Sequence, residues 1–305
     1  MNNLQTSGDG MTFKKDYIYQ FGFMIVSVVL TAIIFLMNNY AVLPTNIPVR
    51  SIIAHIFLDD SSVFLKESSN YSAPYVCRLT HIWTAIFLPM LASTPYLLHF
   101  AGEMKGNYRL KITRIGSFNR YWNRVFFKSG LLGAGCVTAG YTIFSIVVFA
   151  YFPHMSEYPA EATNSADMYA QMAVRRPLNG TLNKLFNNTE SELLYWIPTA
   201  VNIFAYSFLV AVLCLLLYLL IMNRYKAIGM PMIVFYLVEQ FSTRKSLETF
   251  NPKYNILSPR WLLINAGQIF SIFKINGLWY LVFFTIAAAA FYFAGWALFR
   301  KRVMN

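Results

Sequence analysis

The chain has 305 residues, of which 57% are hydrophobic and only 12% are charged, and its mean hydropathy is +0.45. Because a soluble domain carries about 25% charged residues, this composition excludes a soluble enzyme, a disordered tail protein and a free nucleic-acid binder. The formal net charge of +12 then favours the positive-inside rule and contact with anionic lipid over nucleic-acid binding. The sequence predicts an all-α polytopic membrane protein.

Long apolar runs predict the membrane spans. A spanning helix needs about 20 mostly apolar residues, and five spans of this kind are predicted at residues 19–37, 79–102, 129–156, 193–223 and 275–299. A further span at 227–242 is weaker, because its apolar run is short and it includes Glu239. The first span is expected to remain as a signal anchor, since no small-x-small cleavage site follows it.

Basic residues in short segments predict the orientation of the spans. Four short segments together hold 14 basic and 3 acidic residues: the N-terminus, the link between the second and third spans, the turn after the fourth span and the C-terminus. Six spans with both termini cytoplasmic place all four on the cytoplasmic side. Residues 38–78 and 153–192 then form outer loops. Residues 243–274 dissent, because they carry five basic residues against one acidic residue yet lie outside in this topology.

Several motifs that would indicate chemistry are missing. No Walker A, HExxH or GxSxG motif occurs, and the three cysteines and four histidines are scattered, so we expect no enzyme activity, no metal site and no directly bound cofactor. The glycines near the start of the third span are interpreted as small-residue packing positions, with Gly130 paired with Ala134 and Gly135 with Ala139.

Prolines and one acid mark candidates for a gate or a substrate path. Pro89 and Pro95 lie within the second span and should kink it. Pro231 lies at the start of the weak span, and Glu239 near its outer end. Glu239 could contact substrate, although a helix-end residue that faces water is the simpler interpretation.

The link between the second and third spans, residues 101–128, is the most informative segment. It mixes aromatic side chains with seven basic residues, namely Lys105, Arg109, Lys111, Arg114, Arg120, Arg124 and Lys128. Such a segment suits an amphipathic helix on anionic lipid headgroups or a docking element for a cytosolic partner. A solvated basic loop would account for the charges but not for the aromatic residues.

At this link the sequence resembles the permease subunits of type-2 ABC exporters. In that family the second span leads into a Glu, then a Gly, a basic stretch and a Lys that opens the third span; here these are Glu103, Gly106, residues 114–124 and Lys128. Residues 11–22 would be the N-terminal elbow of the family. Residues 261–273, apolar but too short to span, would belong to a re-entrant region at 243–274.

The resemblance implies one transmembrane domain over residues 1–305, in the bacterial plasma membrane, that exports a peptide or another amphipathic substrate. ATP and magnesium would bind to a separate cytosolic ABC ATPase subunit, and a second permease would complete a homo- or heterodimer. Nucleic acid is not an expected partner. The residues implied in coupling to the ATPase subunit are Glu103, Lys105, Gly106, Arg114, Arg120, Tyr121, Trp122, Arg124 and Lys128.

Other classes of function remain open at this point. A membrane adaptor, sensor or immunity protein would bind an extracytoplasmic peptide without transporting it, with residues 153–192 as its receptor surface. A secondary transporter is disfavoured by the scarcity of acids within the spans, and an intramembrane enzyme by the lack of catalytic residues. Loss of function on changing Glu103 would favour the exporter, and dependence on residues 153–192 the adaptor.

Overall fold

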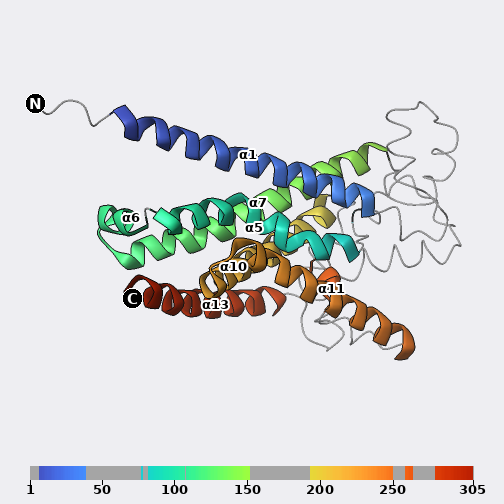
Figure 1. Cartoon of the computed structure of the whole chain (residues 1–305). Coiled ribbons are helices and arrows are strands. Elements are labelled where there is room, and N and C mark those ends of the chain that lie inside the picture. The colour runs from blue at the N-terminus through green and yellow to red at the C-terminus, as the bar shows by residue number, and fades with distance from the viewer. Residues whose placement is uncertain are drawn as a thin grey trace, which may run out of the picture.

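The computed structural model describes residues 7–38, 77, 82–106, 108–151, 193–249, 258–263 and 279–304. Within these residues every regular element is a helix (Figure 1). The helices are α1 (Ser7–Asn38), α5 (Ile82–Gly106), α6 (Tyr108–Ile115), α7 (Phe118–Tyr151), α10 (Leu193–Ile221), α11 (Arg224–Thr249) and α13 (Trp279–Met304). A single helical turn at residues 259–263 lies between α11 and α13 in the chain.

Five of these helices, α1, α5, α7, α10 and α13, are long and apolar enough to cross a membrane, which makes the chain a multi-pass membrane protein. Their apolar segments are Ile18–Leu36, Trp83–Met104, Phe118–Ala150, Thr199–Ile221 and Trp279–Val303. The five strong predicted spans are confirmed as helices of this kind. The weak predicted span lies in α11, which is helical but does not belong to this set, so a sixth crossing stays a prediction.

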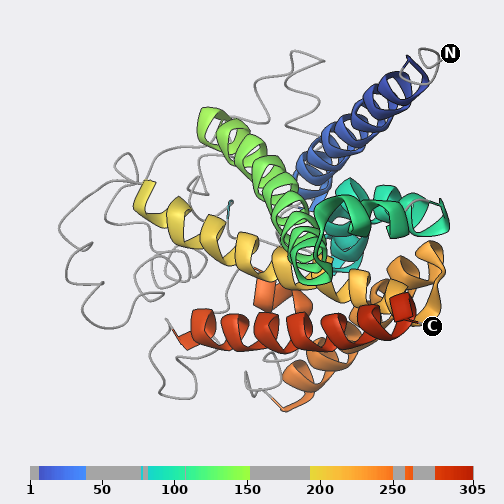
Figure 2. The ribbon, with the colours of Figure 1, turned by 90° about the vertical axis from the view of Figure 1, so that its left-hand side faces the viewer.

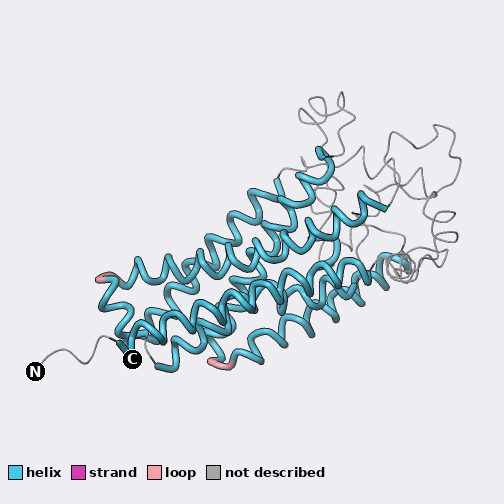
Figure 3. Tube along the Cα trace, turned by 90° about the horizontal axis from the view of Figure 1, so that it is seen from above, coloured by secondary structure: helices cyan, strands magenta, loops and turns pink. Residues whose placement is uncertain are grey.

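Successive long helices run in alternating directions along the bundle. The start of α1, the short helix α6 and the end of α13 lie at one end (Figures 1 and 3), which we call the basic end; the opposite end is the far end. α10 packs against α5, α7, α11 and α13, and Figure 2 shows it between α7 and α13. α1 packs against α5 and α7.

The buried side chains form two clusters along the bundle. The cluster toward the far end includes Phe35, Tyr141, Phe144, Ile203 and Tyr206. The cluster at the basic end, called here the ring cluster, is centred on Phe299 of α13, whose ring contacts those of Phe100, Phe118, Tyr121 and Trp122. Because these rings come from α5, α7 and α13, the ring cluster joins the ends of three helices.

Glycines permit the closest helix contacts. A Cβ added at Gly133 of α7 would lie 2.0 Å from the carbonyl oxygen of Ala92 in α5, and one at Gly130 would lie 2.2 Å from the Phe208 ring. The packing role predicted for Gly130 is therefore confirmed. The same role for Gly135 is wrong, because nothing lies within 4 Å of its added Cβ. Helix rotation turns Gly133, not Gly135, toward a neighbour.

Pro95 creates a polar contact between α1 and α5. Proline has no N–H, so it cannot donate to the carbonyl four residues earlier, which here belongs to Leu91. The hydroxyl of Ser27 in α1 donates to that carbonyl at 2.7 Å. Neighbouring helices satisfy freed backbone groups in this way within membranes. The missing intrahelical bond has thus become a bond between helices; a kink at Pro89 or Pro95 stays a prediction.

Two predicted boundaries need correction. Residues 11–22 are continuous with the first span in α1, so the predicted elbow is not a separate element. The predicted region 243–274 begins inside α11, which continues to Thr249. Outer residues 153–192, and residues 264–274 of the predicted re-entrant region, lie outside the described part of the chain.

Candidate functional site

The basic segment 101–128 is mostly helical. α5 ends at Gly106, the eight-residue helix α6 follows, and α7 begins at Phe118. Gly116 ends α6 with a φ of 73°, a left-handed conformation that glycine adopts without steric cost. Its N–H donates to the carbonyl of Ile112 at 3.0 Å. α6 packs against α5 and α7, so the segment is a short helix held between two long ones.

Glu103 links the end of α5 to the start of α7. Its carboxylate lies 2.7 Å from Nε2 of His99, one turn earlier, and accepts a hydrogen bond from the Tyr121 hydroxyl at 3.2 Å. The Glu103 side chain is 13% exposed. The structure thus brings together two of the predicted coupling residues, Glu103 and Tyr121. His99 was not among the predicted site residues, although its spacing of four from Glu103 is a readable signal.

Tyr121 and Trp122 are buried beneath this segment. Their side chains are 3% and 0% exposed, and both rings stack on Phe299 of α13. They therefore do not lie on the surface of the segment, and their role in coupling to an ATPase subunit stays a prediction. Aromatic rings bury large apolar areas, and the fold uses these two to hold α7 against α13 instead of presenting them to a partner.

Three arginines are exposed along the segment from α6 to the start of α7. Arg114 lies in the last turn of α6, and Arg120 and Arg124 lie in the first turns of α7. We call these three residues the arginine surface. Lys105 and Gly106 end α5, and the Lys105 side chain lies outside the described part of the structure.

Lys128 has a different role from the arginines. Its half-buried ammonium donates to Oε1 of Gln20 in α1 at 3.2 Å and lies 5.4 Å from the centre of the Tyr96 ring. Lys128 therefore joins α7 to α1 and α5, inward of the arginine surface.

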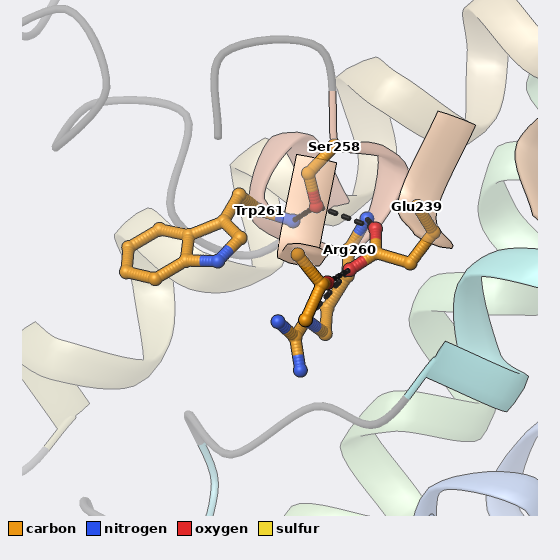
Figure 4. A network of polar contacts seen from close by, with 5 residues as sticks. Glu239, Ser258, Arg260 and Trp261 are labelled. Atoms are coloured by element: carbon orange, nitrogen blue, oxygen red, sulfur yellow. Dashed lines mark hydrogen bonds and ion pairs between the residues drawn. The ribbon is translucent and has the colours of Figure 1, made fainter. Parts of the chain in front are cut away.

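A second polar site surrounds Glu239 of α11 (Figure 4). Its side chain is 1% exposed, and its carboxylate lies 3.1 Å from Nε of Arg260. It also accepts hydrogen bonds from the Ser258 hydroxyl at 2.5 Å, the Arg260 N–H at 3.3 Å and the Thr243 hydroxyl at 3.2 Å. A buried carboxylate needs such partners, because burying an unpaired charge is costly.

Glu239 and Asn202 hold the helical turn at 259–263 from both of its ends. Ser258 caps the turn, since its hydroxyl accepts from the N–H of Trp261 at 3.3 Å. At the other end, the amide of Asn202 in α10 donates to the carbonyls of Leu262 and Leu263 at 3.1 and 2.8 Å. Side chains from α10 and α11 thus fix a segment that comes later in the chain.

This arrangement corrects the prediction for Glu239. The carboxylate neither faces water nor lies open to a substrate, because four donors surround it. It also accounts for part of the dissenting charge in residues 243–274, since Arg260 is paired. Ser258 and Arg260 were not among the predicted site residues, although Ser-Pro is a readable helix-start signal.

The prolines predicted for a gate or a substrate path are all buried within helices. Pro89 and Pro95 lie in α5 and Pro231 in α11, and these two helices pack against each other. A role of the prolines in gating stays a prediction.

No metal-binding constellation is found among the described residues. No three His, Cys, Asp or Glu side chains gather there in a way that could hold an ion. Cys77, Cys136 and Cys214 are all buried.

Comparison with known proteins finds no matching family model, no similar curated protein and no similar solved structure.

Proposed function

We propose that this chain is the transmembrane permease subunit of an ATP-driven exporter with type-2 ABC architecture, and that a separate cytosolic subunit hydrolyses ATP. The observation that carries the proposal is the short helix α6, which is held between α5 and α7 and continues into the arginine surface. A membrane subunit driven by a soluble ATPase needs a firm, exposed element of this kind.

The contacts around α6 suit the transmission of a force from an ATPase subunit to the membrane helices. Glu103 and Tyr121 connect α5 with α7, and the ring cluster connects both helices with α13. Because packed side chains transmit displacement with little compression, a force on α6 would move three helices together. Arg114, Arg120 and Arg124 suit an acidic partner surface, since complementary charge guides association.

The proposal includes α11 as a sixth span, with both termini cytoplasmic. The buried pair of Glu239 and Arg260 supports it, because paired charges cost less within a membrane than single ones. The exposed apolar residues of α1 and α13 suit lipid or a second permease. An amphipathic cargo, such as a peptide, fits the aromatic content of 17%.

The test is a pull-down of the tagged full chain from native membranes in mild detergent, with an ATPase assay of the recovered material. An arginine-surface variant combines Arg114→Gln with Arg120→Gln. A matched junction variant combines Arg224→Gln with Lys226→Gln, and so removes two positive charges from another part of the basic end. We expect a stoichiometric ATPase subunit with the wild-type chain and the junction variant.

The arginine-surface variant should recover at least about tenfold less ATPase subunit, because charged contacts at the rim of an interface control association. Equal recovery with both variants would show that the arginine surface is not the docking site. Recovery of the chain alone, without ATPase activity, would overturn the exporter proposal and favour the adaptor, whose activity would depend on residues 153–192.

A further inference from the structure

A second exposed basic site lies where α10, α11 and α13 meet at the basic end. α10 ends at Ile221 and α11 begins at Arg224. Arg302, near the end of α13, donates from Nη2 to the carbonyl of Leu220 at 3.1 Å. This hydrogen bond places the Arg302 guanidinium beside the start of α11. Arg302 thus lies beside the first turn of α11, which carries Arg224 and Lys226, although α11 and α13 are far apart in the sequence.

The positive charge of this site is not balanced by its own helices. α10 and α13 contain no Asp or Glu, and the first acid of α11 is Glu239, about 22 Å from Arg224 along a helix that rises 1.5 Å per residue. Glu103, the acid at the end of α5, is engaged by His99 and Tyr121.

Helix stability accounts for Arg302, because a cation in the last turn of α13 complements its dipole, but it does not account for Arg224 and Lys226. Positive side chains in the first turn of a helix oppose its dipole, and Arg224 and Lys226 lie in the first turn of α11. Two N–H groups of that turn already have an acceptor, because Oδ1 of Asn223 accepts from the N–H groups of Tyr225 and Lys226 at 3.0 and 3.2 Å. The guanidinium groups of Arg224 and Arg302 donate to the Tyr225 hydroxyl at 2.9 Å and the Leu220 carbonyl at 3.1 Å, and both of these acceptors are neutral, so the positive charge is still available to an anion.

Apolar and aromatic groups surround the same cations. Tyr225 is 68% exposed, and the Arg224 guanidinium lies 4.9 Å from the centre of its ring. Leu220 and Met222, which are 51% and 41% exposed, continue the surface along the end of α10. Tyrosine concentrates at the membrane–water boundary. The site thus places cations directly beside exposed apolar and aromatic side chains that acyl chains can cover.

We propose that Arg224, Lys226 and Arg302 bind the phosphate of an anionic phospholipid, whose chains lie against Leu220 and Met222. A protein partner fits less well, because an acidic protein surface would pair with the cations but would leave the exposed apolar side chains uncovered. Free phosphate would use the cations alone. The site differs from the arginine surface and does not depend on transport, so its failure would leave the proposed function untouched.

The test measures which lipid the purified full-length protein retains. The protein, in uncharged detergent, is mixed with equal amounts of phosphatidylglycerol and phosphatidylcholine, and the bound lipid is counted by native mass spectrometry. We expect the wild type to prefer phosphatidylglycerol. The junction variant, Arg224→Gln with Lys226→Gln, should reduce this preference about tenfold or more, because each cation near an anionic lipid surface contributes severalfold.

Two further variants keep the test decisive. The arginine-surface variant, Arg114→Gln with Arg120→Gln, removes the same charge and should keep the preference; equal loss in both variants would overturn the proposal in favour of a general charge effect. The charge-preserving swap Arg224→Lys with Lys226→Arg should also keep it, and loss there would overturn the proposal. So would a wild type without preference, or displacement of the lipid by glycerophosphoglycerol, which has the headgroup but no acyl chains, at equal concentration.

Discussion

Two glutamates at different levels of the bundle are held in different ways. Glu103, at the basic end, contacts His99 one turn earlier on its own helix and Tyr121 at the start of the next long helix. Glu239, toward the far end, contacts Ser258 and Arg260, which lie 19 and 21 residues later in the chain. Glu103 keeps some exposure, whereas Glu239 is almost fully enclosed.

The difference shows how surroundings change the role of one residue type. A partly exposed carboxylate can exchange its protein partners for water, so losing one partner costs little. An enclosed carboxylate has no such alternative, and removing its charge leaves the opposite charge unpaired. We therefore expect the basic end to tolerate the loss of a polar contact and the Glu239 site to be destabilised by it.

The largest effect is expected for Glu239→Gln. The amide keeps the size of the side chain but leaves Arg260, which is 25% exposed, without its anion. Breaking a buried pair in this way costs about 3 kcal/mol, measured as a loss of unfolding free energy in detergent. The double variant Glu239→Gln with Arg260→Gln should recover part of that loss. A single variant as stable as the wild type would show that water reaches Glu239.

The stability cost of a glycine-to-alanine change should also differ between the two buried clusters. Gly133→Ala should cost about 2 kcal/mol or more, because its Cβ would lie 2.0 Å from the backbone oxygen of Ala92. Gly295→Ala, in the ring cluster, meets the Trp122 ring at 2.5 Å and a Leu216 methyl at 2.6 Å. These are side-chain atoms that can shift, so its cost should be smaller. Melting temperatures of both variants check the order.

Gly135→Ala is the matched control for Gly133→Ala. Its added Cβ meets nothing within 4 Å, so the change should be neutral or stabilise α7 by up to about 1 kcal/mol through helix propensity. A cost equal to that of Gly133→Ala would show that the clash with Ala92 is not the cause.

Glu103→Gln should cost about 1 kcal/mol or less. The amide oxygen still accepts from the Tyr121 hydroxyl, and the side chain lies near enough to solvent to remain hydrated. Chemical unfolding compared side by side with Glu239→Gln measures the contrast directly. Equal losses for the two variants would contradict the difference between the ends.

The smallest effect is expected at the turn between α10 and α11. Met222 has a φ of 56°, which is unfavourable for a residue with a side chain and costs about 1 kcal/mol or more. Met222→Gly should raise stability by up to about 1 kcal/mol, seen as a small rise in melting temperature. A drop would mean that the methionine side chain contributes packing that outweighs the strain.

Much of the fold could be predicted from the sequence, because each membrane span is one continuous run of apolar residues. Length and apolarity along the chain located five helices, and the basic residues identified segments that the structure gathers at one end. The mixed composition of residues 101–128 left open an amphipathic helix or a docking element, and the structure has the short helix α6 within that segment. The packing role of Gly130 was also predicted correctly, because small residues spaced four apart are visible within one stretch of the sequence.

The candidate sites were only partly readable. Arg114, Arg120 and Arg124 were found as charges in a segment, but the burial of Tyr121 and Trp122 was not, because nothing in their spacing tells which way each side of α7 faces. The same reason explains why Gly135 was chosen in place of Gly133. Helix rotation is set by all the neighbours together, and one helix does not reveal it.

What the sequence by itself determined is therefore the class of protein, the positions of its apolar helices and the segments that carry positive charge, since each depends on residues that are adjacent in the chain. Only the tertiary structure decided that Glu239 pairs with Arg260, that Ser27 meets the carbonyl freed by Pro95, and that Arg302 lies beside α11. These contacts depend on the register and rotation of helices, which packing sets across the whole bundle.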